Sequence, residues 1–525
     1  MQRRVVAQLA AILAASATAA YLASQPLLLA IGLAVSGLHT IWRRFSRSIA
    51  ASVVDEDLVY LVTHMYAIAT GKPPRKRLFL LGGVLGDYGE YSRVLKRIAL
   101  LAVEWGYGFI RAIRTVLSDV KNEVFRDFLL RLGEVLNMGE DPAKFLEIER
   151  RTLLSEYNAF YVRTIESARV LLGVYVSAAS SSIFLAVTLA LMAFLYPIPS
   201  EILVLSHFGV AGLLAILAFI IHRSLPQDRL VHRYGQGNPL RSRLKIIVIV
   251  CTLLSAVIGV ICCFGLGPYL AIALSAFPLI LAGLYAKKIE NIVKEIDSFY
   301  PIFVRSFGIA YSLVGHSPTA LRSALRSDYG LLTSLLRRLL ARLTLGVNPV
   351  IAWRRLVIDT WSELVRRLTN ILYDSIDAGA DMACVGTVLS DTAYSFLELK
   401  KQRKQITKTF EYSLYMVHAL LAGIVMAVVK LLNIFDTLLS KFQTIGAVEQ
   451  LPLMFHPLGL HTVEQILPLF IVLISIINAY AVKVAHGGLW QTMLLPLAVF
   501  LLSSGLVMHF TGVVMESLLS NLVVG

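Results

Sequence analysis

Residues 170–196 read VLLGVYVSAASSSIFLAVTLALMAFLY and contain no Asp, Glu, Lys or Arg. A helix needs about 20 apolar residues to cross the hydrocarbon core of a bilayer, and this stretch is longer than that. A segment in lipid must also satisfy its backbone hydrogen bonds internally, which favours a helix over an isolated strand. The stretch therefore predicts a membrane-spanning helix, and the turn at Pro197-Ile-Pro199 predicts that the chain returns.

Similar stretches recur along the 525 residues, of which 57% are hydrophobic and only 16% charged, with a mean hydropathy of +0.71. Soluble globular proteins carry roughly a quarter charged residues, so lipid rather than water is expected around much of this chain. Nine spans are predicted. They are two short ones within residues 1–43, then 170–196, 202–221, 246–264, 269–286, 412–435, 466–482 and 489–510.

The first pair of spans has an alternative. Met1-Gln-Arg-Arg, followed by an apolar run and small residues, also fits a cleavable secretory signal. A second apolar run, Leu27–Trp42, follows at once and ends in Arg43-Arg44. Two helices that turn at Ser24-Gln-Pro26 account for both runs, so we expect a transmembrane hairpin.

Lys and Arg predict the orientation. Residues 43–167 and 287–410 are rich in Lys and Arg. The connectors 196–201, 265–268 and 436–464 contain a single Lys or Arg residue, Lys441. Basic loops stay in the cytosol, so we expect a multi-pass protein of the cell membrane with a cytosolic N-terminus. The net charge of +15 fits this topology and anionic headgroups. A nucleic-acid partner is not expected, because no basic motif interleaved with aromatic residues is present.

The two long basic stretches are copies of each other. With a shift of 240 residues and no gaps, nine of the 36 positions from Gly106 to Asp141 are identical to those from Gly346 to Asp381. Chance would give roughly two or three. Apolar residues at three- and four-residue spacing predict amphipathic helices in both copies, with no sheet.

The sequence thus predicts an all-α polytopic membrane protein with about nine transmembrane helices and two homologous cytosolic helical-bundle domains. The predicted parts are an N-terminal hairpin (1–43), a first cytosolic domain (44–168), four transmembrane helices with a basic link at 222–245 (169–286), a second cytosolic domain (287–410) and three C-terminal helices (411–525). In each cytosolic domain a Gly-x-Asp corner is expected between two helices, because Gly adopts the left-handed conformation and Asp caps the next helix. The corner residues are Gly139, Asp141, Gly379 and Asp381.

At this repeat the chain resembles the membrane platform proteins of type II secretion and type IV pili. The arrangement of spans is most similar to the archaeal branch, the TadC-like and archaellum (FlaJ-like) platform proteins. The resemblance covers nearly the whole chain. It is carried by Trp105-Gly-Tyr-Gly, Phe128-Leu-Leu-Arg-Leu-Gly133, Asn137-Met-Gly139-Glu-Asp-Pro-Ala-Lys-Phe145-Leu, and Tyr157 with Tyr161. The second copy keeps Gly346, Gly379 and Asp381 but has Cys384-Val-Gly where the first has Phe-Leu.

The resemblance implies a mechanical role. Platform proteins dock on a hexameric secretion ATPase in the cytosol and pass its motion to pilin-like or archaellin-like subunits leaving the bilayer. They bind no nucleotide, so neither enzymatic activity nor a cofactor is expected. Small residues such as Ala178-Ala-Ser-Ser-Ser182 could let helices approach closely and hold a homo-oligomer of two or three copies.

The sequence contains no motif typical of nucleotide binding or zinc binding. No phosphate-binding G-x-x-x-x-G-K-[ST] loop exists, and the glycines of residues 82–87 lack the Lys-Ser/Thr. The four cysteines have no zinc-ligand spacing. A polytopic transporter or permease is the alternative function, but most of the predicted spans lack the ionisable residues that coupled transport requires.

Basic clusters on amphipathic helices are the predicted ATPase-docking residues, since the planar guanidinium group pairs well with carboxylates. Residues at three- and four-residue spacing share a helix face. Solvated positive-inside charge is the alternative explanation for these clusters. The candidates are Arg93, Lys96, Arg97, Arg111 and Arg114 in the first copy, and Arg337, Arg338, Arg342, Arg354 and Arg355 in the second.

Overall fold

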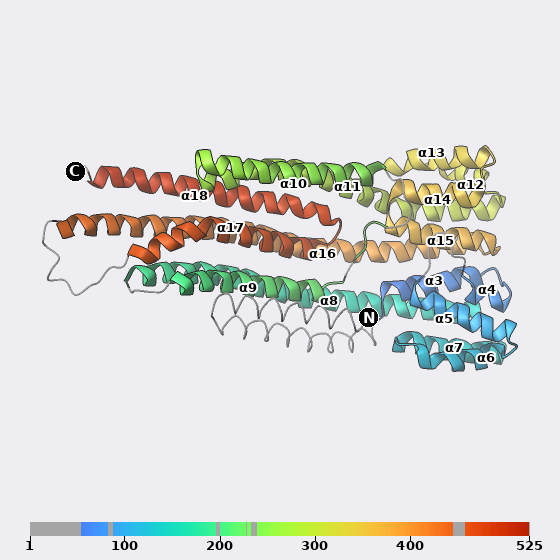
Figure 1. The fold of residues 1–525 in the computed structure, drawn as a ribbon. Coiled ribbons are helices and arrows are strands. Elements are labelled where there is room, and N and C mark those ends of the chain that lie inside the picture. Colours follow the sequence, from blue (N-terminus) through green and yellow to red (C-terminus); the bar gives the residue numbers. More distant parts are fainter. Residues whose placement is uncertain are drawn as a thin grey trace. The chain divides into compact units, whose positions relative to one another are not determined.

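The computed structural model describes residues 54–81, 88–195, 200–226, 228–232, 239–444 and 457–523. Every regular element in these ranges is a helix, and Val231 and Ser362 form an isolated antiparallel bridge. The all-α prediction is confirmed for this part of the chain (Figure 1). The predicted N-terminal hairpin and the glycines of residues 82–87 lie outside the described residues.

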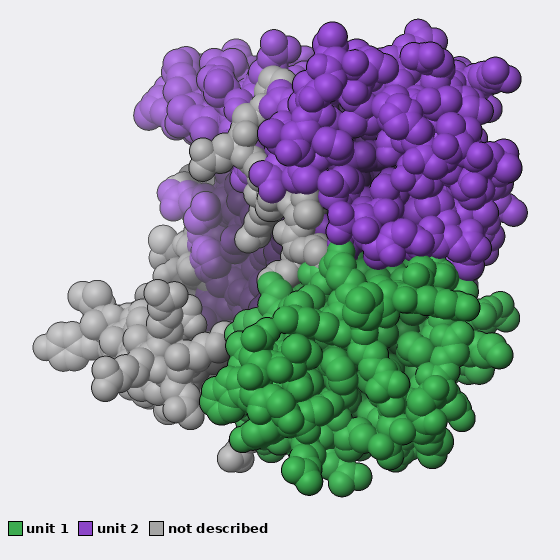
Figure 2. All heavy atoms as spheres, turned by 90° about the vertical axis from the view of Figure 1, so that its right-hand side faces the viewer, with its two compact units in different colours: residues 1–81, 87–160 green, residues 82–86, 161–525 purple. Residues whose placement is uncertain are grey.

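The chain forms two compact units, drawn in different colours in Figure 2: residues 1–81 with 87–160, and residues 82–86 with 161–525. Unit 1 contains short helices. They are α3 (Glu56–Ala69), α4 (Arg75–Phe79), α5 (Glu90–Ala99), the π-helical turn η1 (Leu100–Glu104), α6 (Gly108–Val116), the 3-10 turn η2 (Leu117–Asp119), α7 (Glu123–Met138) and the beginning of α8 (Pro142–Leu195).

Unit 2 holds the rest of α8 and all later elements. Long apolar helices flank a group of short ones, α12 to α15. In chain order they are α9 (Ser200–Ser224), α10 (Pro239–Leu266), α11 (Pro268–Val314), α12 (Ser317–Ala324), α13 (Leu331–Thr344), α14 (Pro349–Thr360), α15 (Glu363–Asp377), α16 (Met382–Thr444), α17 (Pro457–His486), the 3-10 turn η3 (Trp490–Met493) and α18 (Leu494–Val523).

Seven helical segments among the described residues are long and apolar enough to cross a membrane, and they coincide with the seven spans predicted after residue 168. They lie in α8, α9, α10, α11, α16, α17 and η3–α18. The chain is therefore a multi-pass membrane protein. Within unit 2, α11 packs against α10, α16 and α18, and α9 packs against α17.

Three helices are much longer than a membrane span. α8 has 54 residues, α11 has 47 and α16 has 63. At 1.5 Å per residue they extend about 70–95 Å, whereas about 30 Å crosses the hydrocarbon core. The domain limits proposed at residues 168, 286 and 410 all fall inside these helices, which continue unbroken through them (Figure 1). The short-helix regions are therefore joined to the apolar segments without an intervening loop.

The helix starts follow the 240-residue shift. Helices α7 and α15 begin at Glu123 and Glu363, and α8 and α16 begin at Pro142 and Met382, 240 residues apart in both cases. The residues that precede α7 and α15, Asn122 and Ser362, both cap their helix by accepting a hydrogen bond from the backbone three residues later. The N-cap satisfies a backbone N–H that has no partner inside the helix.

A local difference explains why the second copy lacks the Phe-Leu pair. In the first copy Leu146 is fully buried and Phe145 stacks near Phe128, with ring centroids 6.2 Å apart. In the second copy Gly386 occupies the position of Leu146, because α11 and α16 approach closely there. A Cβ atom on Gly308 would lie 2.4 Å from the carbonyl oxygen of Met382. Glycine at both positions makes this crossing possible.

Candidate functional site

The turn before α6 presents two aromatic side chains to solvent. Trp105 is 63% exposed and Tyr107 47% exposed, with their rings edge to face at 6.3 Å. Gly106 and Gly108 have φ values of 69° and 72°, so the left-handed backbone that projects this turn depends on glycine. Single exposed apolar residues are ordinary, but Trp and Tyr together with Arg are the residues enriched in protein–protein hot spots.

Arg111 and Arg114 lie on the first two turns of α6, beside these aromatic residues. Both are exposed, and with Tyr107 and Thr115 they line a shallow hollow of about 290 Å³. The buried face of the same helix carries Ala112, Ile113 and Val116, which fixes the outward direction of the arginines. We call Trp105, Tyr107, Arg111 and Arg114 the tip surface. It can accept a carboxylate and an apolar side chain together.

The other predicted residues of the first copy lie on α5. Arg93, Lys96 and Arg97 are all exposed on one face, opposite the buried Val94, Leu95 and Ile98. Arg97 donates to Asp119 at 2.5 Å. Among the described residues no carboxylate forms an ion pair with Arg93, Lys96, Arg111 or Arg114, so their charge is available to a partner.

The second copy does not repeat this surface. Arg337, Arg338 and Arg354 are exposed, but Arg342 is half-buried and pairs with Asp359 at 3.1 Å, as does Arg355. The positions equivalent to Trp105, Tyr107 and Arg111 are Leu345, Val347 and Ile351, which are exposed and aliphatic. Two of the five predicted arginines of the second copy therefore belong to an internal ion pair, and the combination of exposed aromatic and cationic groups is found at these positions in the first copy alone.

The two corners have closely similar geometry. Gly139 and Gly379 have φ values of 74° and 66°, and in each case the next helix begins three residues later. The side chain of Asp141 accepts from the backbone N–H of Ala143 at 3.0 Å, and that of Asp381 from Ala383 at 3.1 Å.

Sequence patterns did not indicate that an arginine in α16 would be buried. Arg403 is 4% exposed and donates to the backbone oxygens of Val484 and Ala485, at 2.9 Å each, in the last turn of α17. It also donates to Pro226 O at 2.7 Å and to the carboxylate of Asp228 at 3.1 Å, in the link after α9. Helix C-termini leave carbonyl groups without partners, and a guanidinium group satisfies several at once.

Tyr161 of α8 completes this contact, since its hydroxyl donates to Asp228 at 2.5 Å. We call Tyr161, Asp228 and Arg403 the arginine junction. It joins α8, the link after α9, α16 and the end of α17 at one point. Among so many lysines and arginines near span ends, periodicity alone did not distinguish Arg403 from its exposed neighbours Lys401 and Lys404.

A second buried contact lies between α11 and the connector before α18. Glu290 accepts the backbone N–H of Leu489 at 2.9 Å and an ion pair from Lys294 at 2.5 Å. A Cβ atom on Gly488, whose φ is 75°, would lie 2.6 Å from the Glu290 carboxylate. This turn therefore requires glycine both for its backbone conformation and for space.

The basic link predicted at residues 222–245 is attached to the short helices of unit 2. The backbone N–H of Glu363 donates to Leu230 O at 3.0 Å, and His232 Nε2 lies 2.9 Å from Val357 O. Burial alone would raise the pKa of the Glu363 carboxyl, but hydrogen bonds and charge from Arg366 and Arg367 outweigh burial and hold that pKa at about 2.

Replacing Glu363 by Gln is therefore expected to lower the melting temperature at pH 7, since Arg367 is buried beside it. The ordinary pKa is 4.5 and the folded value about 2, so the stabilisation is complete above pH 4.5 and is lost as the pH falls toward 2. The matched control is Glu123→Gln at the equivalent, exposed position. Equal melting temperatures for both variants across pH, measured in nanodiscs, would contradict this role.

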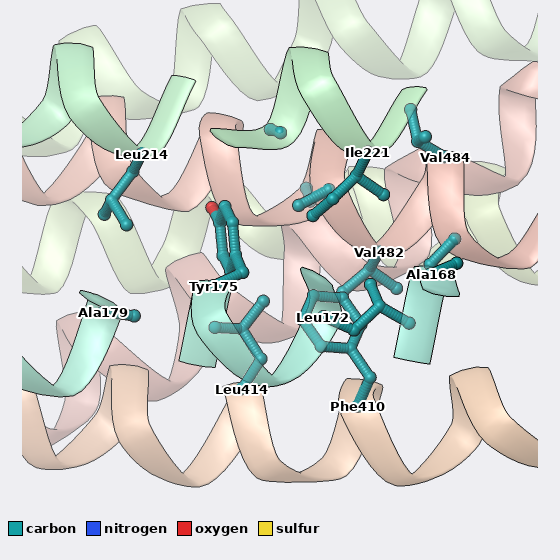
Figure 3. Packing of buried hydrophobic residues seen from close by; sticks show 14 of the residues in the cluster. Ala168, Leu172, Tyr175, Ala179, Leu214, Ile221, Phe410, Leu414, Val482 and Val484 are labelled. Carbon is teal, nitrogen blue, oxygen red and sulfur yellow. The ribbon is translucent and has the colours of Figure 1, made fainter. Parts of the chain in front are cut away.

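Polar side chains inside the predicted spans bind one another. His418 of α16 lies 3.1 Å from Ser475 Oγ and 3.2 Å from the amide of Asn478, and the Tyr175 hydroxyl donates to that amide oxygen at 2.7 Å. Figure 3 shows Tyr175 within the surrounding apolar cluster. Lys430 pairs with Glu516 at 2.9 Å and with Glu464 at 3.6 Å. These contacts join α8, α16, α17 and α18.

In the described ranges, no three His, Cys, Asp or Glu side chains are grouped closely enough to hold a metal ion.

Two relatives match most of this chain. The chain is 26% identical over 491 residues to flagella accessory protein J of Methanocaldococcus jannaschii. This alignment covers 89% of the present chain and 85% of the relative. It is 23% identical over 478 residues to flagella accessory protein J of Methanococcus voltae, with coverage of 88% and 85%. No family model and no solved structure matches.

Proposed function

Since this chain belongs to the family that its sequence resembles, the archaellum platform proteins that include flagella accessory protein J, we propose that it is the membrane platform of an archaellum-type filament assembly machine. It couples a cytosolic hexameric secretion ATPase to the extraction and polymerisation of pilin-like subunits. It is not an enzyme, and its N-terminus lies in the cytosol.

The tip surface is the observation that carries the docking part of this proposal. Its aromatic residues provide apolar area at low entropic cost, and its arginines provide charge-assisted hydrogen bonds. An acidic, partly apolar loop of the ATPase fits this chemistry. The interface is proposed at the first copy, because the second copy lacks the aromatic groups and directs Arg342 to Asp359.

The continuous helices and the arginine junction support the coupling part. A force applied to the short helices of unit 2 passes along α11 and α16 without a loop at the membrane boundary. Arg403 connects α16 to the end of α17, so these helices move as one body. Polar groups within the spans are occupied with each other, as in His418 with Asn478, which favours a mechanical element over an ion path.

Deletion of the gene, followed by its reintroduction, tests the proposal. Cells that lack it are expected to make the filament subunit but to assemble no filaments, seen by electron microscopy, and the intact gene should restore them. Filaments in the deletion strain would contradict the proposal. Solute uptake into liposomes that contain only the purified protein would support the transporter instead.

A further inference from the structure

A groove lies between α8 and α16 where both helices enter the membrane. Its volume is about 470 Å³. Arg169 is the last charged residue before the charge-free segment of α8, and Glu411 is the last before that of α16. The groove, between Arg169 and Ser413, is therefore at the level of the lipid headgroups on the cytosolic side predicted from Lys and Arg.

One end of the groove is polar and cationic. Arg169, Gln405 and Thr409 line it and are exposed, and Ser413 follows one turn deeper. The only carboxylate that pairs with Arg169 among the described residues is Glu166, at 3.8 Å, and the arginine side chain stays 68% exposed. So long a contact between exposed groups contributes little, which leaves guanidinium donors for another anion.

The other end is apolar and open. Leu172 and Phe410 form its floor, side by side in the buried cluster of Figure 3. Tyr175 supports Phe410 edge to face, with centroids 5.8 Å apart. A Cβ atom added to Gly173 would meet nothing within 4 Å, so the absence of a side chain leaves the groove open along α8.

We propose that this groove binds one anionic phospholipid. The phosphate accepts hydrogen bonds from Arg169, with Gln405 and Thr409 beside it, and the first part of an acyl chain lies on Leu172 and Phe410 over Gly173. Arg is suited to this role because its fork of donors matches a phosphate. The volume fits a headgroup with the start of a chain, since ligand sites commonly measure about 300–1,000 Å³.

The site lies on the two long helices that continue from short-helix regions into the membrane. A lipid bound there would therefore affect the proposed coupling between the cytosolic ATPase and the membrane segments. A lipid held there bridges α8 and α16 at the boundary where they must move together. Lipid binding at this groove depends neither on which ATPase docks nor on which filament is assembled.

Native mass spectrometry of the full-length protein, titrated with phosphatidylglycerol or phosphatidylcholine, tests the proposal. Arg169→Gln removes the charge and Gly173→Trp fills the groove. Arg169→Gln is expected to weaken phosphatidylglycerol binding about tenfold, the usual effect of losing one charge-assisted hydrogen bond. Gly173→Trp is expected to weaken it at least as much, because the indole occupies the space of the acyl chain. Arg163→Gln and Gly212→Trp are matched controls on exposed helix faces and should bind as wild type does. Melting temperatures report whether each variant folds.

Three results would overturn the proposal. The first is unchanged phosphatidylglycerol binding in Arg169→Gln, which retains the apolar groove. The second is equal affinity for phosphatidylcholine, which would show that the site does not distinguish an anionic headgroup from a zwitterionic one. The third is displacement of the lipid by inorganic phosphate alone, which would identify the site as one for a free anion.

Discussion

Arg403→Ala is expected to lower the free energy of unfolding by about 3–5 kcal/mol, the range measured when one partner of a buried ion pair is removed. The variant leaves the carboxylate of Asp228 without its cation and the carbonyl groups of Val484 and Ala485 without donors. Unfolding of the protein in nanodiscs, followed by denaturant titration, measures this change. Lys401→Ala, two residues away and exposed, is the control and should shift stability by less than about 1 kcal/mol.

Arg403→Lys separates charge from geometry at the same position. Lysine keeps the pair with Asp228 but cannot donate to four acceptors in a planar fork, so an intermediate loss is expected. Wild-type stability for both variants would show that the arginine junction does not hold the helices together.

Gly308→Ala is expected to destabilise the protein by about 3 kcal/mol or more. Its Cβ atom would lie 2.4 Å from the carbonyl oxygen of Met382 and 2.9 Å from the Cα atom of Gly386, so backbone must move rather than a flexible side chain. Gly212→Ala on α9 is the matched control, because a Cβ atom there meets nothing within 4 Å.

The two substitutions should differ in their effect on the free energy of unfolding. Alanine is about 1 kcal/mol better than glycine inside a helix, so the control is expected to be neutral or stabilising. If Gly308→Ala is also neutral in the same unfolding assay, α11 and α16 do not cross as closely as the structure describes.

Sequence reasoning was most informative where periodicity and charge act locally. The long apolar stretches identified seven spans that the structure confirms, because backbone hydrogen bonding in lipid leaves few alternatives to a helix. The 240-residue shift anticipated where α15 and α16 begin relative to α7 and α8, since the capping residues recur with it.

Sequence reasoning was least informative about contacts between distant residues. Arg403 and Asp228 are 175 positions apart, and nothing in the local pattern of either indicates the other. Arg342 was grouped with Arg337 and Arg338 by spacing, yet the fold turns it toward Asp359. The exposed pair Trp105 and Tyr107 was noted only as part of a resemblance, because exposure depends on the packing of α6 and the turn before it.

Binding of the cognate hexameric secretion ATPase, the partner proposed for this protein, to the full-length protein in nanodiscs tests the central claim most directly. Wild-type protein is expected to bind, and Arg111→Glu with Arg114→Glu should reduce the affinity about tenfold or more through charge reversal at the tip surface. The double variant Arg126→Glu with Lys144→Glu changes the same amount of charge at exposed positions of the same unit and should bind as wild type does. Failure of the wild-type protein to bind, or equal binding by both double variants, would contradict the account.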